Sequence, residues 1–464
     1  MLNKALIENV LSAALTTGGD FSEVFVENRF TNNMHYQGGK LEKSLAGRDF
    51  GVGIRIFKGL QSVYAYTNDY SEEGLLKAAK TAAEALQGVK SEKEIILPLD
   101  KQSIETAHPI QLMPSGVEKN RKLAVLRNAS DIVTNYDPAI SQAIVRLNDE
   151  EQNVLIANSE GTFVEDKRVR SRMAIIAVAS DGTDMQTGVY GPGAYQGFEF
   201  IEGLDLNHYA KEAARIAVTM LHADPAPSGK FPVIIDNEFG GVIFHEACGH
   251  GLEAEAVAKN NSVFAGKIGE KVASDLVTYI DDGTIPNEWG SINIDDEGEK
   301  ARKNTLIENG ILKGYMIDKF NGRRMEADST GSGRRESYKF APTSRMTNTY
   351  IAQGKSTPEE IIANTEHGIY AKYMGGGSVN PATGDYNFAV NEAYIVKDGK
   401  IDKPIRGATL VGNGAKTIQK VDMVGNNLAH GAGMCGASSG SIPVNVGQPM
   451  LRVSEITVGG REAN

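Results

Sequence analysis

The sequence predicts an α+β fold with two domains, an N-terminal α+β domain and a C-terminal β-rich domain that carries one prominent helix. A chain of 464 residues is long enough to bury two hydrophobic cores, and its hydrophobic content of 41% is ordinary for a globular protein. In the first half, strand patterns alternate with a few helical ones, whereas the second half is richer in glycine and in short β-like segments. Runs of strands with few helices favour α+β over a doubly wound arrangement.

The first domain opens with an amphipathic helix, because Leu2, Leu6, Val10 and Leu15 recur at helical spacing. Short segments rich in β-forming residues follow, with glycine turns between them, and we expect strands over 22–28, 40–48, 51–57 and 61–67. A second helix is expected over 71–87 with Ser71 as its N-cap. The polar stretch 88–106 has no clear period and is predicted to be a loop.

The remainder of the first domain is predicted from the same signals. We expect helices near 115–135 and 207–222, and strands over 140–148, 154–158, 162–169 and 173–180. The segment "ADPAPSGK" combines two prolines, a glycine and small residues, which is typical of a linker. A boundary within 223–229 gives domains of 1–225 and 226–464. In the second domain, strand patterns cover 276–282, 311–318, 387–401, 408–413 and 451–460.

The charge and the cysteine content exclude several classes of protein. The net charge of −11 argues against nucleic-acid binding, which needs a concentrated basic face. The longest apolar runs have the length of a strand, so we expect no membrane span, and no secretory signal peptide is recognisable. Only Cys248 and Cys435 are present, which excludes a disulfide scaffold and favours a cytoplasmic protein.

The stretch "FHEACGHGLEAE" (244–255) contains the main chemical signal, two histidines that bracket a glutamate. In the common zinc-peptidase motif the histidines are four residues apart, but His245 and His250 are five apart. On a regular helix, five residues correspond to a rotation of about 140°, so both side chains could not reach one ion. A π-bulge would restore alignment, or the helix could end near Cys248 with His250 in a turn. Either solution predicts an irregular backbone here.

A catalytic zinc usually has three protein ligands and leaves one position for water. A third ligand must therefore come from outside the two histidines, and the residue types leave five candidates: Cys435, His367, His430, Glu253 and Glu255. Cys248 is expected to pack as a small buried hydrophobe. Cys435 lies in a glycine-rich stretch that we interpret as a loop, where a thiolate would be a soft ligand suited to zinc.

Three long segments resemble the TldD/PmbA metallopeptidases, and specifically the TldD-like members that keep the H-E-x-x-x-H motif. They are "HEACGHGLEAE" (245–255), "STGSGRRESYKFAPTSRMTNTY" (329–350) and "GAGMCGASSGSIPVNVGQPMLRVSEITVGG" (431–460). The resemblance covers essentially the whole chain. It implies one zinc ion per chain with His245, His250 and Cys435 as ligands and Glu246 as general base. Iron is also compatible with histidine and cysteine ligands.

The resemblance also implies partners. Members of this family form dimers, either with themselves or with a metal-less PmbA-like relative, and their substrates are unfolded peptides. No nucleic-acid or membrane partner is expected. A non-catalytic regulatory subunit is the competing hypothesis, and the intact His245–Glu246–His250 set disfavours it. A purely structural metal is a third hypothesis, which would require four protein ligands.

Four further residues are candidates for contacts with the oxyanion or the substrate. Arg334, Arg335 and Tyr338 lie in the glycine-containing segment "GSGRRESYKF", and His430 precedes Cys435 by five residues. The alternative for the arginine pair is ion pairing with nearby acidic residues such as Glu326 or Asp328.

Overall fold

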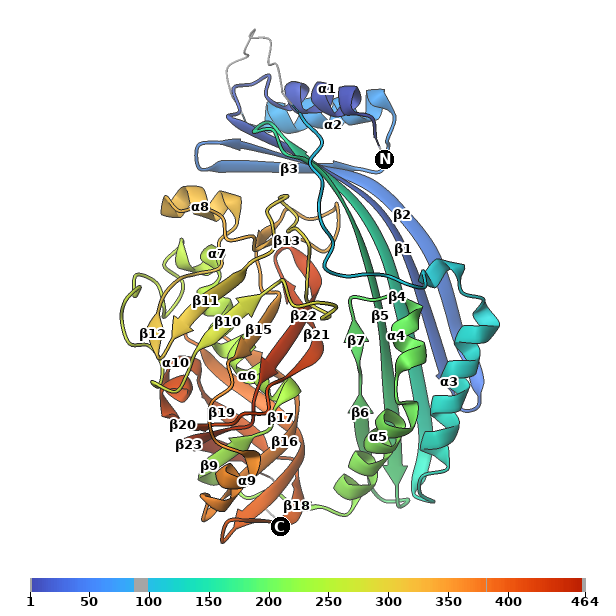
Figure 1. Ribbon diagram of the computed structural model, residues 1–464, viewed down its shortest axis with the longest axis vertical. Helices are drawn as coiled ribbons and strands as arrows, with labels where there is room; N and C mark the ends of the chain where they lie inside the picture. Colours follow the sequence, from blue (N-terminus) through green and yellow to red (C-terminus); the bar gives the residue numbers. More distant parts are fainter. Residues whose placement is uncertain (1, 87–98, 381, 461–464) are drawn as a thin grey trace.

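The N-terminal half is built on a long, curved antiparallel sheet that runs along the whole molecule (Figure 1). The computed structural model describes residues 2–86, 99–380 and 382–460. The strand order is β3-β2-β1-β4-β5-β6, with β7 paired to β5. The strands are β1 (Phe21–Gln37), β2 (Lys40–Lys58), β3 (Gln61–Thr67), β4 (Ile140–Asn158), β5 (Phe163–Ser180), β6 (Met185–Tyr190) and β7 (Gly193–Ala194).

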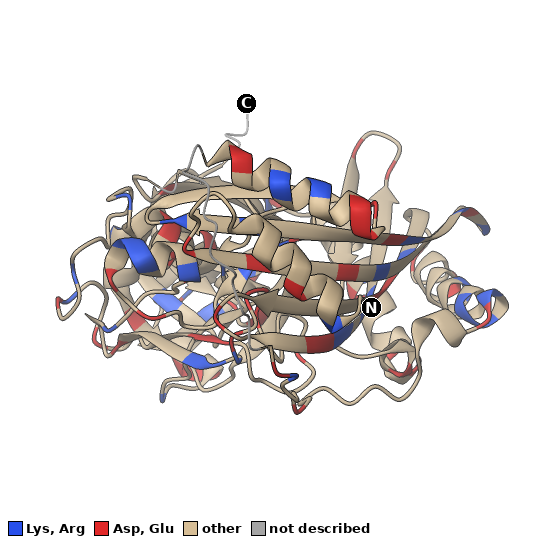
Figure 2. Ribbon diagram, turned by 90° about the horizontal axis from the view of Figure 1, so that it is seen from above, with Lys and Arg blue, Asp and Glu red and all other residues tan. Residues whose placement is uncertain are grey.

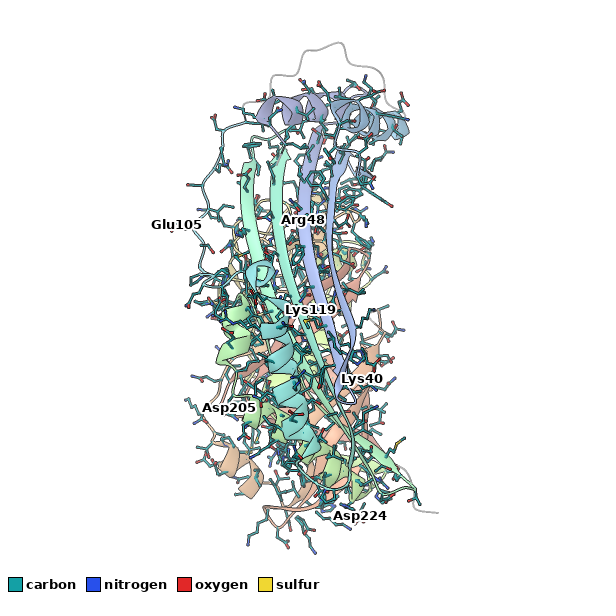
Figure 3. The ribbon with its side chains drawn as sticks, turned by 90° about the vertical axis from the view of Figure 1, so that its right-hand side faces the viewer. Lys40, Arg48, Glu105, Lys119, Asp205 and Asp224 are labelled. Carbon is teal, nitrogen blue, oxygen red and sulfur yellow. The ribbon has the colours of Figure 1, made fainter. Side chains whose placement is uncertain are left out.

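Helices cover one face of this sheet. Near one end, α1 (Lys4–Ala14) and α2 (Glu72–Ala85) share a hydrophobic core with β1 and β2, and the Ser71 side chain caps α2 by accepting from the Gly74 N–H. Near the other end, α3 (Lys119–Thr134) and α5 (Leu206–Leu221) pack on β4 and β5, and α4 (Phe198–Gly203) joins the same core. Figure 3 shows α3, which starts at Lys119, lying along the long strands. The four helices that the sequence predicts for the N-terminal half are therefore present. The predicted loop at 88–106 lies mostly outside the described residues.

The strands are much longer than the sequence predicts. Residues 40–48 and 51–57 belong to one strand, β2, and the interruptions expected at 149–153 and 170–172 lie in the middle of β4 and β5. The prediction was wrong there because polar residues such as Gln152 and Arg170 resemble a turn in the sequence. In the structure they are buried, since that face of the sheet packs against the C-terminal half of the chain.

The C-terminal half contains two larger sheets. One has the order β12-β11-β10-β15-β22-β21, and the other has the order β16-β9-β23-β19-β17-β18-β8, with β20 on β23. A further pairing of β16 with β17 closes five strands of the second sheet into a ring. The strands are β8 (Asp224–Pro225), β9 (Gly229–Ile235), β10 (Tyr279–Asp282), β11 (Lys303–Glu308), β12 (Ile311–Leu312), β13 (Gly333–Arg334), β14 (Thr343–Ser344), β15 (Asn348–Ile351), β16 (His367–Val379), β17 (Asp385–Lys397), β18 (Lys400–Arg406), β19 (Thr409–Asn413), β20 (Val421–Val424), β21 (Ala429–Ala437), β22 (Gly440–Gln448) and β23 (Leu451–Gly459).

Short helices connect these strands, namely α6 (Val242–Phe244), α7 (Ala254–Val257), α8 (Lys319–Met325), α9 (Pro358–Ala363) and α10 (Gly414–Thr417). The segment interpreted as a linker includes β8, which pairs with β18. Residues of both charges are distributed along the helices and strands seen from above (Figure 2). Among the helices of the described residues, none combines the length and the apolar character that crossing a membrane requires.

A buried group of charges joins the N-terminal sheet to the C-terminal half. Glu23 and Arg55 are register partners on β1 and β2, and the Arg55 guanidinium lies 2.6 Å from carboxylate oxygens of both Glu23 and Glu297. Arg335 donates to the other oxygen of Glu23 at 2.5 Å. All four side chains are almost inaccessible to solvent. Burial of charges is costly unless each is paired, so this interface tolerates little change.

We expect Glu23→Ala to destabilise the protein by about 3–5 kcal/mol, because two buried guanidiniums would lose a carboxylate partner. Urea unfolding followed by circular dichroism measures the change. Glu42→Ala is the matched control, since Glu42 forms an exposed ion pair with Lys40 that is worth at most about 1 kcal/mol. Equal unfolding midpoints for the two variants would contradict the prediction.

Candidate metal centre

The two histidines are aligned by an irregular helical segment. After α6, residues His245–Gly249 form a π-helical turn and His250–Leu252 form a 3₁₀ turn. The His250 N–H donates to the His245 carbonyl, which is the i→i+5 bond of a π turn. The irregular backbone expected from the five-residue spacing is therefore confirmed, and the π turn is the solution adopted. Gly249 permits this path, since a Cβ there would lie 2.3 Å from the Met346 sulfur.

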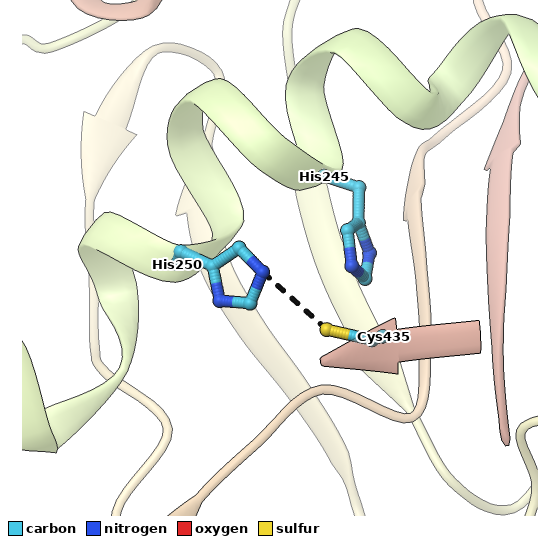
Figure 4. Close-up of side chains that lie close together, drawn as sticks. All are labelled: His245, His250 and Cys435. Atoms are coloured by element: carbon cyan, nitrogen blue, oxygen red, sulfur yellow. Dashed lines mark hydrogen bonds between the residues drawn. The ribbon is translucent and has the colours of Figure 1, made fainter. Parts of the chain in front are cut away.

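Cys435 brings a third ligand atom to the same place. It lies on β21 and was expected on a loop; this interpretation was wrong because backbone pairing with β22 makes a regular strand from a segment rich in glycine. Ligand atoms of His245, His250 and Cys435 all lie within 4.8 Å of one another, and Cys435 Sγ is 3.3 Å from His250 Nε2 (Figure 4). The two imidazole rings are nearly perpendicular, with centroids 5.4 Å apart.

The donor set fits a metal such as zinc. Two imidazoles and a thiol converge, and His245 Nδ1 is buried without a hydrogen-bond partner among the described residues. Burial alone would raise the pKa of the Cys435 thiol, but the two neighbouring imidazoles lower this pKa well below its ordinary range. Burial lowers the pKa of His250, whereas Glu253 and Cys435 together raise it well above its ordinary value. The thiolate form that a metal requires is thus favoured.

A second layer of side chains holds two of these groups in position. Glu253 Oε2 lies 2.9 Å from His250 Nδ1, which leaves Nε2 directed toward Cys435. The buried Arg345 donates to the Cys435 carbonyl, to Ser439 Oγ at 2.8 Å and to the Gly440 carbonyl at 2.9 Å. Glu253 was a candidate third ligand, but here it orients a ligand instead. Sequence reasoning did not find Arg345, because only the fold brings it beside β21.

Glu246 lies beside the cluster. Its Oε2 is 3.6 Å from His250 Nε2, and its side chain is 30% exposed, so water can reach it. Cys248 is fully buried in the hydrophobic core, as expected, and burial raises the pKa of its thiol. The Glu255 carboxylate accepts hydrogen bonds from Lys259 and Ser438. His367 lies at the exposed start of β16. Neither belongs to the group of converging ligand atoms.

The four candidates for oxyanion or substrate contacts have other partners. Arg335 forms an ion pair with Glu23, so the alternative of ion pairing holds for Arg335, although with a partner other than Glu326 or Asp328. Arg334 donates to the Met346 and Pro443 carbonyls instead. The Tyr338 hydroxyl lies 3.3 Å from Asp49. His430 Nδ1 lies 3.6 Å from Glu288. Since His430 and Cys435 are an odd number of residues apart on β21, their side chains point to opposite faces.

Three family models match the chain in succession. PmbA/TldA metallopeptidase domain 1 matches residues 22–86, the central domain matches 113–221 and the C-terminal domain matches 228–460. Proteins of Buchnera aphidicola and Haemophilus influenzae, each named a metalloprotease TldD homolog, are 37% identical to this chain, and each match covers 95% of this chain and 93% of the relative. A metalloprotease of Methanocaldococcus jannaschii is 35% identical, over 97% of this chain and 99% of that protein.

Solved structures with the same fold are more distant in sequence. TldE from Thermococcus kodakarensis has a TM-score of 0.77 at 20% identity, with 98% of this chain and 100% of that chain covered. A structure from Thermotoga maritima has a TM-score of 0.80 at 20% identity, with the same coverage. At this identity the likeness establishes the fold and not the activity.

We expect the purified chain to bind one metal ion, and His250→Ala and Cys435→Ala to lose it, because each removes one of three converging ligand atoms. Elemental analysis of chain prepared without chelators measures the content. Cys248→Ala is the control, since Cys248 lies in the core and outside the ligand group. Equal metal retention by Cys435→Ala and Cys248→Ala would remove Cys435 from the ligand set.

We expect Glu253→Gln to weaken metal binding by about 10–100-fold, because a neutral amide orients His250 less strongly than a carboxylate. Competition with a chromophoric chelator gives the affinity. Glu255→Gln on the same segment should leave the affinity unchanged, because Glu255 contacts Lys259 and Ser438. A Glu253→Gln affinity equal to that of the parent chain would show that this contact does not position the ligand.

Proposed function

Because the chain belongs to the TldD/PmbA metallopeptidase family, we propose that it is a zinc-dependent peptidase that hydrolyses unfolded or unstructured peptides. The observation that carries this proposal is the convergence of His245, His250 and Cys435 beside the solvent-accessible carboxylate of Glu246. A structural role for the metal fits less well. A closed structural site has four protein ligands, whereas the cluster in the described residues offers three.

In the proposed reaction, the protein holds the metal and moves a proton. A zinc ion held by His245, His250 and Cys435 would supply two effects, a lower pKa for bound water and polarisation of the scissile carbonyl. Glu246 accepts the proton of the attacking water and transfers it to the leaving amine, the two roles of a positioned carboxylate. Its partial exposure keeps it accessible to both water and substrate. Glu253 and Arg345 contribute indirectly, because they fix His250 and the backbone of Cys435.

The proposal includes an assembly and a compartment. We place the chain in the cytoplasm as a dimer, with itself or with a metal-less PmbA-like relative, and without nucleic-acid or membrane partners. The competing function is a non-catalytic regulatory subunit. The position of Glu246 argues against this function, since a chain that only binds a partner needs no general base beside a ligand cluster. Iron in place of zinc is compatible with the same ligands, and elemental analysis distinguishes the two metals.

We expect Glu246→Gln to lower the rate of peptide hydrolysis by about 10²–10⁴-fold while the metal remains bound, because the amide cannot accept a proton. The assay uses an unstructured peptide with a fluorophore and a quencher at its ends, together with elemental analysis of the same sample. Glu255→Gln serves as control and should retain activity. Undiminished turnover by Glu246→Gln would refute the mechanism. If the parent chain hydrolyses no peptide with either zinc or iron bound, the regulatory role is favoured.

A further inference from the structure

A cavity outside the metal centre lies between the N-terminal sheet and the β21–β22 hairpin. Its volume is about 380 Å³, and it is bounded on one side by β1, β4 and β5 and on the other by the hairpin, Trp289 and Arg334. The hairpin faces the long strands in Figure 1. Met434 lines the cavity, whereas its neighbour Cys435 belongs to the metal centre. Because successive side chains of a strand point to opposite faces, the cavity and the metal centre lie on opposite sides of β21.

The sheet presents three arginines to this cavity. The residues Arg168, Arg170 and Arg172 alternate along β5, so all three point to the same face, away from the core formed with α3 and α5. Their register partners on β4 are Gln152, Glu150 and Asn148. With the other lining cations, the cavity wall contains six arginines and four acidic residues. The wall therefore has an excess of positive charge.

Three of the lining arginines have no carboxylate among their hydrogen-bond acceptors. Arg170 donates to the Trp289 and Ser291 carbonyls at 2.9 and 2.7 Å, Arg172 donates to the Ala432 carbonyl at 2.9 Å, and Arg334 donates to two carbonyls. By contrast, Arg168 and Arg335 each have a carboxylate partner. Arg172 Nε is buried and lacks any hydrogen-bond partner among the described residues.

The pKa values of these three arginines agree with their lack of carboxylate partners. Burial, together with the positive charge of the neighbouring Arg170, lowers the pKa of Arg334 to about 9. Burial also lowers the pKa of Arg170 and that of Arg172. A shift in this direction means that the positive charges are incompletely compensated in the protein alone. A bound anion would supply the missing compensation.

The opposite wall of the cavity combines apolar side chains with Arg334, and it reaches solvent at Met434. Met434 is 50% exposed, and it pairs in register with Pro443, which also lines the cavity. The Trp289 ring lies next to Arg172, whose guanidinium carbon is 5.6 Å from the ring centroid. Trp289 is anchored by its indole N–H, which donates to the Gly433 carbonyl at 2.8 Å. A ligand that fits both walls combines an anionic group with a small apolar body.

We propose that this cavity binds a peptide carboxylate, with Arg172 and Arg334 contacting the carboxylate and Trp289 and Met434 contacting the adjacent apolar side chain. Guanidinium groups match the planar geometry of a carboxylate through paired N–H donors. The volume falls in the range of pockets for small ligands and accommodates a residue or two rather than a folded partner. This binding does not depend on the metal centre, so the proposal stands or falls separately from peptide hydrolysis.

Trp289 provides a direct measurement, because it is the only tryptophan of the chain. Its fluorescence is titrated in the Glu246→Gln chain, which prevents hydrolysis from consuming the peptide. The probes are acetyl-Ala-Leu with a free carboxylate, the same peptide as its amide, and acetyl-Ala-Glu amide. We expect a saturable change with the free acid and binding weaker by about tenfold or more for the leucine amide, which loses the charged hydrogen bonds. Binding of the glutamyl amide shows whether a side-chain carboxylate is also accepted.

Two variants test the assigned contacts. Arg172→Gln should weaken binding of the free acid by about tenfold or more. Asn148→Asp should do the same without removing any arginine, since it places a carboxylate opposite Arg172 in the sheet register. Arg127→Gln, on the exposed side of α3, is the control and should bind normally. Thermal melting of each variant verifies that it is folded.

Two outcomes would overturn the proposal. The first is that neither carboxylate peptide causes a saturable change in Trp289 fluorescence. This includes the result that inorganic phosphate causes such a change and the peptides do not. The second is equal affinity of the parent chain for the free acid and the amide, or binding of the free acid by folded Arg172→Gln and Asn148→Asp that is as tight as in the parent chain.

Discussion

A single backbone hydrogen bond, from the His250 N–H to the His245 carbonyl, is the constraint on which the metal centre depends. It widens one helical turn and thereby brings two imidazoles, five residues apart in sequence, to the same side of the backbone. The widened turn packs tightly, because Gly249 leaves room for the Met346 sulfur where any side chain would collide. The distortion is therefore supported by tertiary packing rather than by the local sequence alone.

Arginines hold together the surroundings of this turn. Arg345 connects the backbone of Cys435 to the turn between β21 and β22, and Arg335 connects the segment after β13 to the N-terminal sheet through Glu23. Such buried guanidiniums specify one arrangement, since a displaced partner would leave a charge without compensation. Arg170, Arg172 and Arg334 differ because only carbonyls accept their hydrogen bonds. This difference separates arginines that stabilise the interface from arginines that are suited to binding an anion.

The β21–β22 hairpin has two chemically distinct faces. On one face Cys435 joins the two histidines, and on the other Met434 and Pro443 border the arginine-lined cavity. Strand alternation produces this division without any additional element. His430 shows the effect of this alternation. It is close to Cys435 in the sequence, which suggested a shared site, but it is five residues away on the same strand and therefore points to the other face.

The sequence by itself determined the local features. Helical periodicity identified α1, α2 and α5, the cap at Ser71 was recognisable, and the spacing of His245 and His250 required an irregular backbone. These properties depend on neighbouring residues, which the sequence contains directly. Only the tertiary structure decided the continuity of β4 and β5, the partners of Arg334 and Arg335, and the role of Glu253 beside His250. Each of these depends on burial against segments distant in the chain, and burial is a property of the packed molecule rather than of any local pattern.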